Sequence, residues 1–118
     1  MTSLTSWMDR FFELREELVS LLRELTLRES PTTDKAAVDR LGEFVAERLR
    51  DLGAQVERIP QETVGDHWIA TGGDPEAPIQ ILTLCHLDTV WPLGTLSRMP
   101  VREENGRLYG PGVFDMKG

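Results

Sequence analysis

The stretch IQILTLCHLDTV, residues 79–90, decides the fold class of this chain. Residues 79–85 form a nearly continuous apolar run between turn-forming residues, which is typical of a strand buried on both faces of a helix-flanked sheet. The stretch then becomes polar, with His86 and Asp88 just past the expected end of the strand. In α/β sheets, reactive side chains gather where strands end and loops begin. The stretch therefore predicts an α/β fold with a functional site close to His86.

Two helices are predicted before this strand. Between residues 7 and 25, apolar side chains recur at three- and four-residue steps, which indicates an amphipathic helix whose apolar stripe packs on the sheet. Pro31 then breaks the helical pattern, and Thr33 or Asp34 can cap a second helix. The apolar stripe of that second helix ends before Gly53, a good helix stop.

Shorter strands are predicted on either side of residues 79–85. Residues 54–59 and 67–71 have strand character, and residues 101–109 form a hairpin that turns at Asn105-Gly106. Helices followed by strands favour an α/β fold with a helix-flanked mixed or parallel sheet. A buried central strand needs more neighbours than 118 residues supply, so we expect an N-terminal piece of a larger domain. A compact small domain is the alternative.

The composition narrows the class of protein. The chain has 13 basic and 20 acidic residues, a net charge of −7, which disfavours binding to nucleic acid or to an anionic membrane. No run approaches the roughly 18 apolar residues of a membrane span and no signal peptide is visible, so a cytoplasmic protein is expected. The one cysteine, Cys85, excludes an internal disulfide and a cysteine-rich zinc site. A metal would have to be held by histidine and carboxylates.

A second motif, GPGVFDMKG at residues 110–118, delivers Asp115 on a glycine-rich turn. Neutral imidazole is the commonest protein ligand of zinc, and a neighbouring carboxylate can accept its other N–H. Asp88 lies two residues after His86, on the same side of an extended chain. A His-x-Asp pair alone is usually an ordinary surface feature. Together with Asp115 it indicates part of a metal site.

HLDTV at residues 86–90 and YGPGVFDMKG at residues 109–118 resemble the zinc-dependent exopeptidases and deacylases. This family includes glutamate carboxypeptidase, acetylornithine deacetylase and succinyl-diaminopimelate desuccinylase, and ESPT at residues 29–32 also looks like its N-terminal layout. The resemblance implies that His86 binds one zinc, that Asp115 bridges two zincs, and that Asp88 is the acidic active-site residue supporting His86. It also implies a cis peptide bond between Asp115 and Met116.

The resemblance implies a di-zinc metallohydrolase that cleaves an amide bond next to a free carboxylate. A glutamate-type carboxypeptidase is expected ahead of an N-acyl amino acid deacylase, with a small peptide or N-acyl amino acid as substrate. Full-length relatives are expected to be homodimers. A non-enzymatic fragment, or a split half that needs a complementing C-terminal chain, is the alternative.

The resemblance also implies what the chain lacks. Family members continue with a Glu-Glu pair, a further acidic ligand and a distant histidine, and no such positions follow Gly118 here. Catalytic zinc normally keeps three protein ligands. Residues 1–118 are therefore expected to be the N-terminal portion of the catalytic domain, without its remainder or the dimerisation domain. The isolated chain is expected to be inactive.

Three further side chains near these motifs have competing interpretations. Cys85 is expected to be a core thiol rather than a nucleophile, because adjacent strand residues point to opposite faces. Trp91 could line a substrate pocket or pack under a loop. Lys117 could reach a substrate carboxylate, but a solvated lysine is the favoured interpretation.

Overall fold

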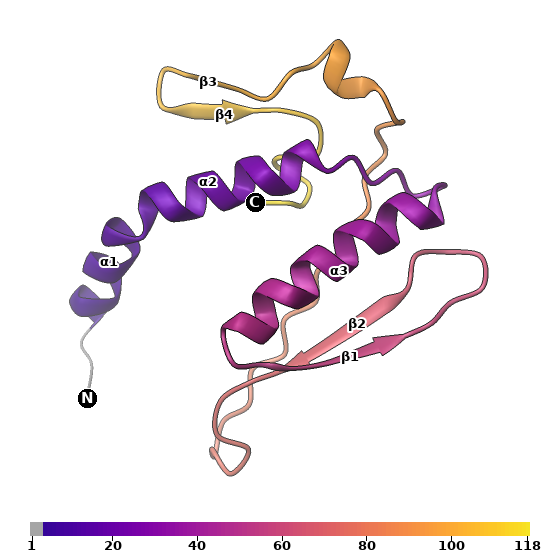
Figure 1. Ribbon diagram of the computed structural model, residues 1–118. Helices are drawn as coiled ribbons and strands as arrows, with labels where there is room; N and C mark the ends of the chain where they lie inside the picture. Colours follow the sequence, from indigo (N-terminus) through magenta and orange to yellow (C-terminus); the bar gives the residue numbers. More distant parts are fainter. Residues whose placement is uncertain (1–3) are drawn as a thin grey trace.

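The computed structural model describes residues 4–118, which form three α-helices, a short 3₁₀ helix and two β-hairpins (Figure 1). Along the chain these are α1 (Leu4–Glu13), α2 (Arg15–Leu27), α3 (Lys35–Asp51), β1 (Gln55–Ile59), β2 (His67–Thr71), η1 (Thr95–Ser97), β3 (Arg102–Glu104) and β4 (Arg107–Tyr109). Each hairpin is a separate two-stranded antiparallel sheet. The α/β class is therefore confirmed as a mixture of helices and small sheets.

The first predicted helix is present as two helices that meet at Leu14, where the chain bends (Figure 1). The apolar stripe of α1 does not pack on a sheet, contrary to the prediction. No residue of α1 is buried, and Phe11 and Phe12 are 61% and 70% exposed. The reason is that the sheets among the described residues are two-stranded hairpins, which are too small to cover this helix as well as α3.

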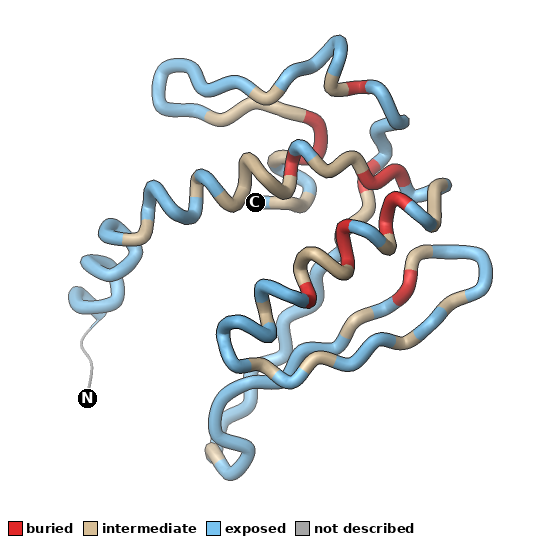
Figure 2. The backbone as a smooth tube through the Cα atoms, in the orientation of Figure 1, coloured by how far each residue is buried: buried red, intermediate tan, exposed pale blue. Residues whose placement is uncertain are grey.

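The second helix, α3, begins and ends as predicted. Asp34 is its N-cap and accepts a hydrogen bond from the backbone N–H of Ala37 at 2.9 Å. Gly53, with φ of +89°, follows its last turn. Helix α3 supplies the small hydrophobic core of the described residues and contains several of the segments drawn in red in Figure 2. Its buried apolar side chains are Ala37, Val38, Leu41 and Ala46.

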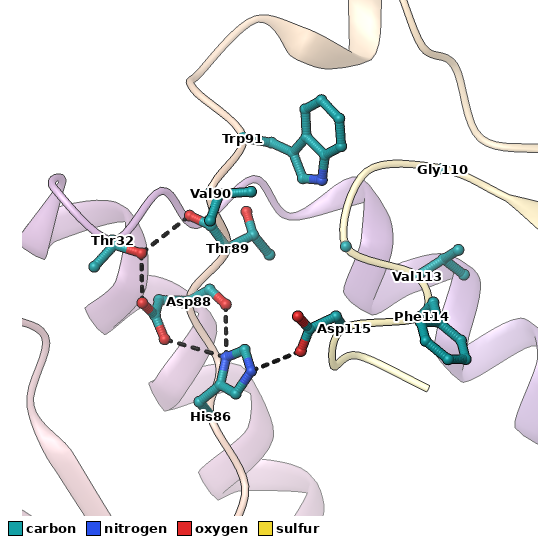
Figure 3. A pocket seen from close by; sticks show the side chains of 11 residues that line it. Thr32, His86, Asp88, Thr89, Val90, Trp91, Gly110, Val113, Phe114 and Asp115 are labelled. Atoms are coloured by element: carbon teal, nitrogen blue, oxygen red, sulfur yellow. Dashed lines mark hydrogen bonds and ion pairs between the residues drawn. The ribbon is translucent and has the colours of Figure 1, made fainter.

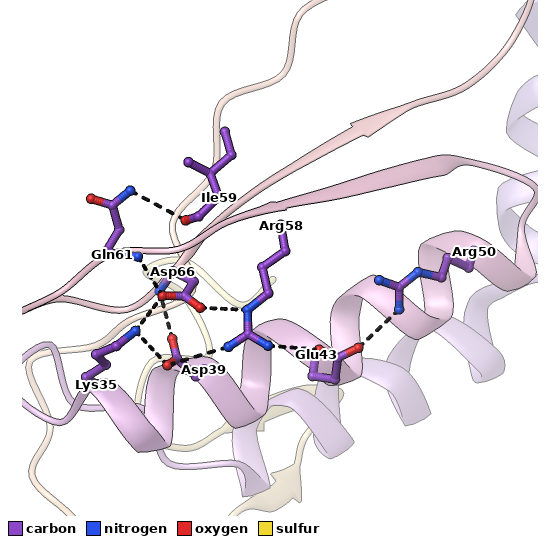
Figure 4. Close-up of polar contacts among 8 residues, drawn as sticks. All are labelled: Lys35, Asp39, Glu43, Arg50, Arg58, Ile59, Gln61 and Asp66. Atoms are coloured by element: carbon purple, nitrogen blue, oxygen red, sulfur yellow. Dashed lines mark hydrogen bonds and ion pairs between the residues drawn. The ribbon is translucent and has the colours of Figure 1, made fainter.

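A polar network joins α3 to the β1–β2 hairpin (Figure 4). Buried Asp66 pairs with Lys35 of α3 and accepts a hydrogen bond from Arg58 Nε of β1 at 2.6 Å. The backbone N–H of Asp66 donates to Asp39 of α3 at 2.7 Å. The Lys35 hydrogen bond and the backbone N–H of Gln61 hold the pKa of Asp66 well below its usual range. The network thus fixes the hairpin on the helix.

The strand predicted at residues 79–85 is not formed. These residues make no regular sheet, and Ile81, Leu82 and Leu84 are 89%, 83% and 82% exposed. A buried strand needs partner strands at its edges and layers on its faces, and β1 and β2 pair only with each other among the described residues. Parallel pairing is limited there to one bridge, Pro31 to Thr89. The predicted helix-flanked parallel sheet is therefore absent from the described residues.

Two remaining predictions have opposite outcomes. The β3–β4 hairpin turns at Asn105 and Gly106, whose φ angles of +52° and +71° are those of the predicted Asn-Gly turn. Cys85 is exposed, so its interpretation as a core thiol is wrong, for the same reason that its strand is not formed.

Between residues 4 and 118, no helix combines the length and apolar character that crossing a bilayer requires.

Candidate functional site

An open pocket of about 350 Å³ lies between the chain after residue 85 and the glycine-rich turn (Figure 3). Its lining includes the three predicted site residues, His86, Asp88 and Asp115, together with Thr32 and Trp91. Trp91 therefore lines a pocket, which is the first of the two roles considered for it from the sequence. The pocket brings together residues that are far apart in the sequence.

His86 lies between the two predicted carboxylates (Figure 3). Its Nε2 is 2.9 Å from Asp115 Oδ1. Its Nδ1 is 2.9 Å from the backbone oxygen of Asp88 and 3.3 Å from Asp88 Oδ1. These hydrogen bonds, with Asp115 contributing most, raise the pKa of His86 above its ordinary value in the metal-free chain.

The loop between α2 and α3 holds the segment that carries His86. The backbone N–H of Thr89 donates to the oxygen of Ser30 at 2.8 Å, and that of Thr32 donates to the oxygen of Thr89 at 2.9 Å. The fully buried Ser30 donates its hydroxyl to the oxygen of Leu87 at 2.8 Å. The position of residues 87–89 is thus fixed by a loop more than fifty residues earlier in the chain.

Glu29, in the same loop, holds the segment that follows the site. Its carboxylate accepts hydrogen bonds from the backbone N–H groups of Gly94 at 2.8 Å and Leu96 at 3.0 Å. These bonds lower the pKa of Glu29. The sequence analysis noted residues 29–32 as a family-like motif but did not assign these contacts. No local sequence signal indicates these contacts, because they join Glu29 to residues 65 and 67 positions later in the chain.

The glycine-rich turn presents Asp115 from the other side of the pocket. Gly112 has φ of +75°, and a Cβ at this position would lie 2.5 Å from Thr89 Cγ2. A glycine therefore permits both the backbone conformation and the close approach to residue 89. The peptide bond between Asp115 and Met116 is cis, as expected from the family resemblance.

Lys117 anchors this turn to the end of α2. Its Nζ donates to the backbone oxygens of Leu25 at 3.0 Å and Arg28 at 2.6 Å. Burial lowers the pKa of Lys117 to about 8, and the charge of Glu29 opposes that shift. The interpretation of Lys117 as a solvated lysine is therefore wrong, because the turn folds its side chain onto the helix end.

Two of the side chains in the pocket suit a metal ion. His86 Nε2 and Asp115 Oδ1 face each other across the pocket at a hydrogen-bond distance of 2.9 Å. Imidazole and carboxylate are also donors that zinc accepts. However, residues 4–118 contain no group of three or more His, Cys, Asp or Glu side chains arranged to hold a metal. The described residues thus offer part of a ligand set.

The fold and pocket define an α/β chain with a histidine held between two carboxylates at a loop junction. No family model matches the chain. Carboxypeptidase G2 of Pseudomonas sp. (strain RS-16) is 32% identical over 107 residues, which are 86% of this chain and 25% of that protein. Succinyl-diaminopimelate desuccinylases of Nitrosospira multiformis and Thioalkalivibrio sulfidiphilus are 36% and 33% identical, over 86% of this chain and 26% of each enzyme.

The chain is therefore a homologue of carboxypeptidase G2 and of the succinyl-diaminopimelate desuccinylases, and the resemblance drawn from residues 86–90 and 109–118 is confirmed. It spans about a quarter of the length of the curated relatives that it matches. These relatives are named as a carboxypeptidase and as desuccinylases.

Proposed function

We propose that this chain carries the first part of the active site of a zinc-dependent hydrolase that cleaves an amide bond next to a free carboxylate. The observation that supports this proposal is the position of His86 between Asp88 and Asp115. In this proposal residues 1–118 are the N-terminal portion of a catalytic domain. The roles of the three residues remain those predicted from the sequence.

Each side chain has a distinct part in the proposed site. In this proposal His86 and Asp115 would hold zinc, with Asp115 as the ligand that two ions would share. Asp88 accepts the Nδ1–H of His86 through its backbone oxygen, which leaves Nε2 free to act as a ligand on the Asp115 side. Zinc, when bound, acts as a Lewis acid that polarises the substrate carbonyl group.

The names of the relatives support a proposal for the substrate class. One relative is named a carboxypeptidase and others are named desuccinylases. We propose a glutamate-type carboxypeptidase ahead of an N-acyl amino acid deacylase for the complete protein, which we expect to be a cytoplasmic homodimer without nucleic-acid or membrane partners. Assays with N-acyl glutamates and with N-succinyl-diaminopimelate distinguish the two activities.

If the reading frame continues past the codon for Gly118, the proposal is tested on the complete product of the gene. We expect this protein to release glutamate from an N-acyl glutamate, and we expect a chelator to abolish the release and added zinc to restore it. His86→Ala and Asp115→Ala should abolish it, and Asp88→Asn should lower zinc affinity or activity by roughly 10- to 100-fold, as expected for a residue that orients a ligand. Hydrolysis that survives metal removal would refute the proposal.

The isolated chain provides a second test. Because the described residues contain no group of three or more His, Cys, Asp or Glu side chains arranged to hold a metal, we expect no hydrolysis and no tight zinc binding by this chain alone. Isothermal calorimetry measures the binding. Tight binding of two zinc ions per chain would contradict the incomplete site, and a complementing chain that restores activity would support the split-half alternative.

A further inference from the structure

The contact between Thr32 and Asp88 is a direct side-chain link from the α2–α3 loop to the pocket (Figure 3). Thr32 Oγ1 donates to Asp88 Oδ2 at 2.5 Å. The same hydroxyl lies 3.2 Å from the backbone oxygen of Thr89. Thr32 also lines the pocket. Its hydroxyl is therefore placed to control one oxygen of the Asp88 carboxylate.

An aspartate carboxylate rotates easily, because its terminal torsion has a broad, roughly two-fold energy profile. A hydrogen bond to a charged carboxylate is stronger than one between neutral groups. With Oδ2 bonded to Thr32, the other oxygen, Oδ1, faces His86 Nδ1 at 3.3 Å. The Thr32 hydroxyl thus favours the carboxylate orientation in which Oδ1 lies beside His86 Nδ1, next to the backbone oxygen of Asp88 that is 2.9 Å from the same nitrogen.

The loop that carries Thr32 is itself held on both sides. The backbone of Thr32 bonds to Thr89, and Asp34, two residues later, caps α3. The exposed Thr32 side chain therefore extends from a backbone that is held in place. This rigidity is what a group that positions a metal ligand requires.

We propose that Thr32 is a positioning residue, which orients the Asp88 carboxylate and through it the His86 imidazole that faces Asp115. The role in metal binding rests on the proposed function, whereas the orientation of His86 does not require metal. Ser30 and Glu29 hold the backbone, and Thr32 adds the one contact from the loop that reaches a carboxylate of the site. The hydroxyl matters here, rather than the bulk of the side chain.

The orientation is tested by NMR of the metal-free, ¹⁵N-labelled chain. Thr32→Val removes the hydroxyl at nearly constant volume, and Thr32→Ser keeps it. Thr33→Val is the matched control, because Thr33 is exposed and adjacent. We expect Thr32→Val to shift the ring ¹⁵N resonances of His86, and Thr32→Ser and Thr33→Val to leave them as in the original chain.

Several outcomes would overturn the role of the hydroxyl. One such outcome is that the His86 ring resonances of Thr32→Val are the same as in the original chain. Another is that Thr32→Ser or Thr33→Val shifts these resonances as much as Thr32→Val does. Thr32→Ala is a second way to remove the hydroxyl if the valine variant fails to fold. A denaturation curve of each variant shows that the spectra compare folded chains.

Zinc affinity of the complete protein tests the consequence for the metal site. Thr32→Val should weaken zinc binding about 10-fold, the lower end of the effect of groups that orient metal ligands. The same change in an Asp88→Asn background should add little, because the hydroxyl then has no carboxylate to orient. Absence of zinc binding in the original complete protein would refute the proposed function, whereas full zinc affinity of Thr32→Val would refute the positioning role.

Discussion

Each ring nitrogen of His86 lies 2.9 Å from an oxygen atom, and this arrangement makes the protonation of the ring important for metal binding. The Asp115 hydrogen bond and the Asp88 backbone oxygen both favour the protonated ring. Zinc binds the neutral ring, so protons and metal compete for this side chain. In the metal-free chain the imidazolium is the form that the pocket stabilises.

The pKa of His86 should therefore lie above its ordinary value of 6.5 in the metal-free chain, and Asp115→Asn should lower it. A raised pKa in the folded state means that the stabilisation by these contacts is present below pH 6.5 and is lost as the pH rises through the raised value. NMR titration of the ring Cε1–H resonances measures the pKa. Asp74→Asn, in an exposed turn, is the control, and an unchanged pKa in Asp115→Asn would contradict the assigned cause.

Gly112→Ala and Gly53→Ala form a matched pair, because both glycines have positive φ. Around Gly53 a Cβ meets nothing within 4 Å, whereas at Gly112 it would lie 2.5 Å from Thr89 Cγ2. We expect Gly53→Ala to cost about 1 kcal/mol of unfolding free energy from backbone strain alone. Gly112→Ala should cost about 2 kcal/mol more, because overpacking is added. Urea denaturation measures both, and equal losses would show that residue 89 moves aside freely.

Elements determined by local chemistry were predictable from the sequence, and those that depend on distant partners were not. Asp34 and Gly53 delimit α3, and Asn105-Gly106 turns the hairpin, each through nearby backbone. Residues 79–85 have a strand-like composition, but a strand also needs neighbours to pair with. The composition therefore predicted a strand that the described residues do not complete.

The same distinction applies to the candidate site. His86, Asp88 and Asp115 are in short motifs, and the structure brings them together, as the motifs indicated. The contacts of Glu29, Ser30 and Lys117 were missed, because each joins residues 57 to 92 positions apart. Local sequence patterns carry no information about such pairs.

The packing of the β1–β2 hairpin on α3 should be sensitive to acid. Because the pKa of Asp66 is lowered in the folded state, its stabilisation is present above its ordinary value of 3.8 and is lost as the pH falls below that value. Asp66→Asn should lower the thermal midpoint near neutral pH and reduce its fall between pH 5 and roughly pH 2, the range where such carboxylates protonate. Circular dichroism melts test this, with Asp51→Asn at the exposed end of α3 as control; a variant with the same acid sensitivity as the original chain would refute it.

The molecule as a whole is thin and has a small core. Its extents are 47 × 42 × 19 Å and its radius of gyration is 16.1 Å. A compact domain of this length would have a radius of about 13.5 Å. Within residues 4–118, the four buried hydrophobic residues all belong to α3. Much apolar surface therefore remains exposed, on α1 and α2 and along residues 79–84.

The isolated chain should self-associate through this surface, because exposed apolar segments with unpaired backbone tend to aggregate. Replacing Ile81 and Leu84, which are 89% and 82% exposed, by lysine should reduce association without lowering the thermal midpoint. Light scattering coupled to size exclusion measures the association over a concentration series. Buried Leu41 is the contrasting position, where Leu41→Lys should unfold the chain. A monomer at all concentrations would contradict the expectation.

The α2–α3 loop sets an order of events during synthesis. The loop leaves the ribosome before the segments it holds: Thr32 precedes Asp88 by 56 residues, and Leu25 precedes Lys117 by 92. At about 5–20 residues per second, roughly 5–20 s separate the last pair. Until Leu87 and Asp88 have been synthesised, Ser30 and Thr32 lack the partners that their hydroxyls have in the folded chain. Helix α3 and the β1–β2 hairpin can pack together early, whereas the pocket is completed only when residues 110–115 emerge.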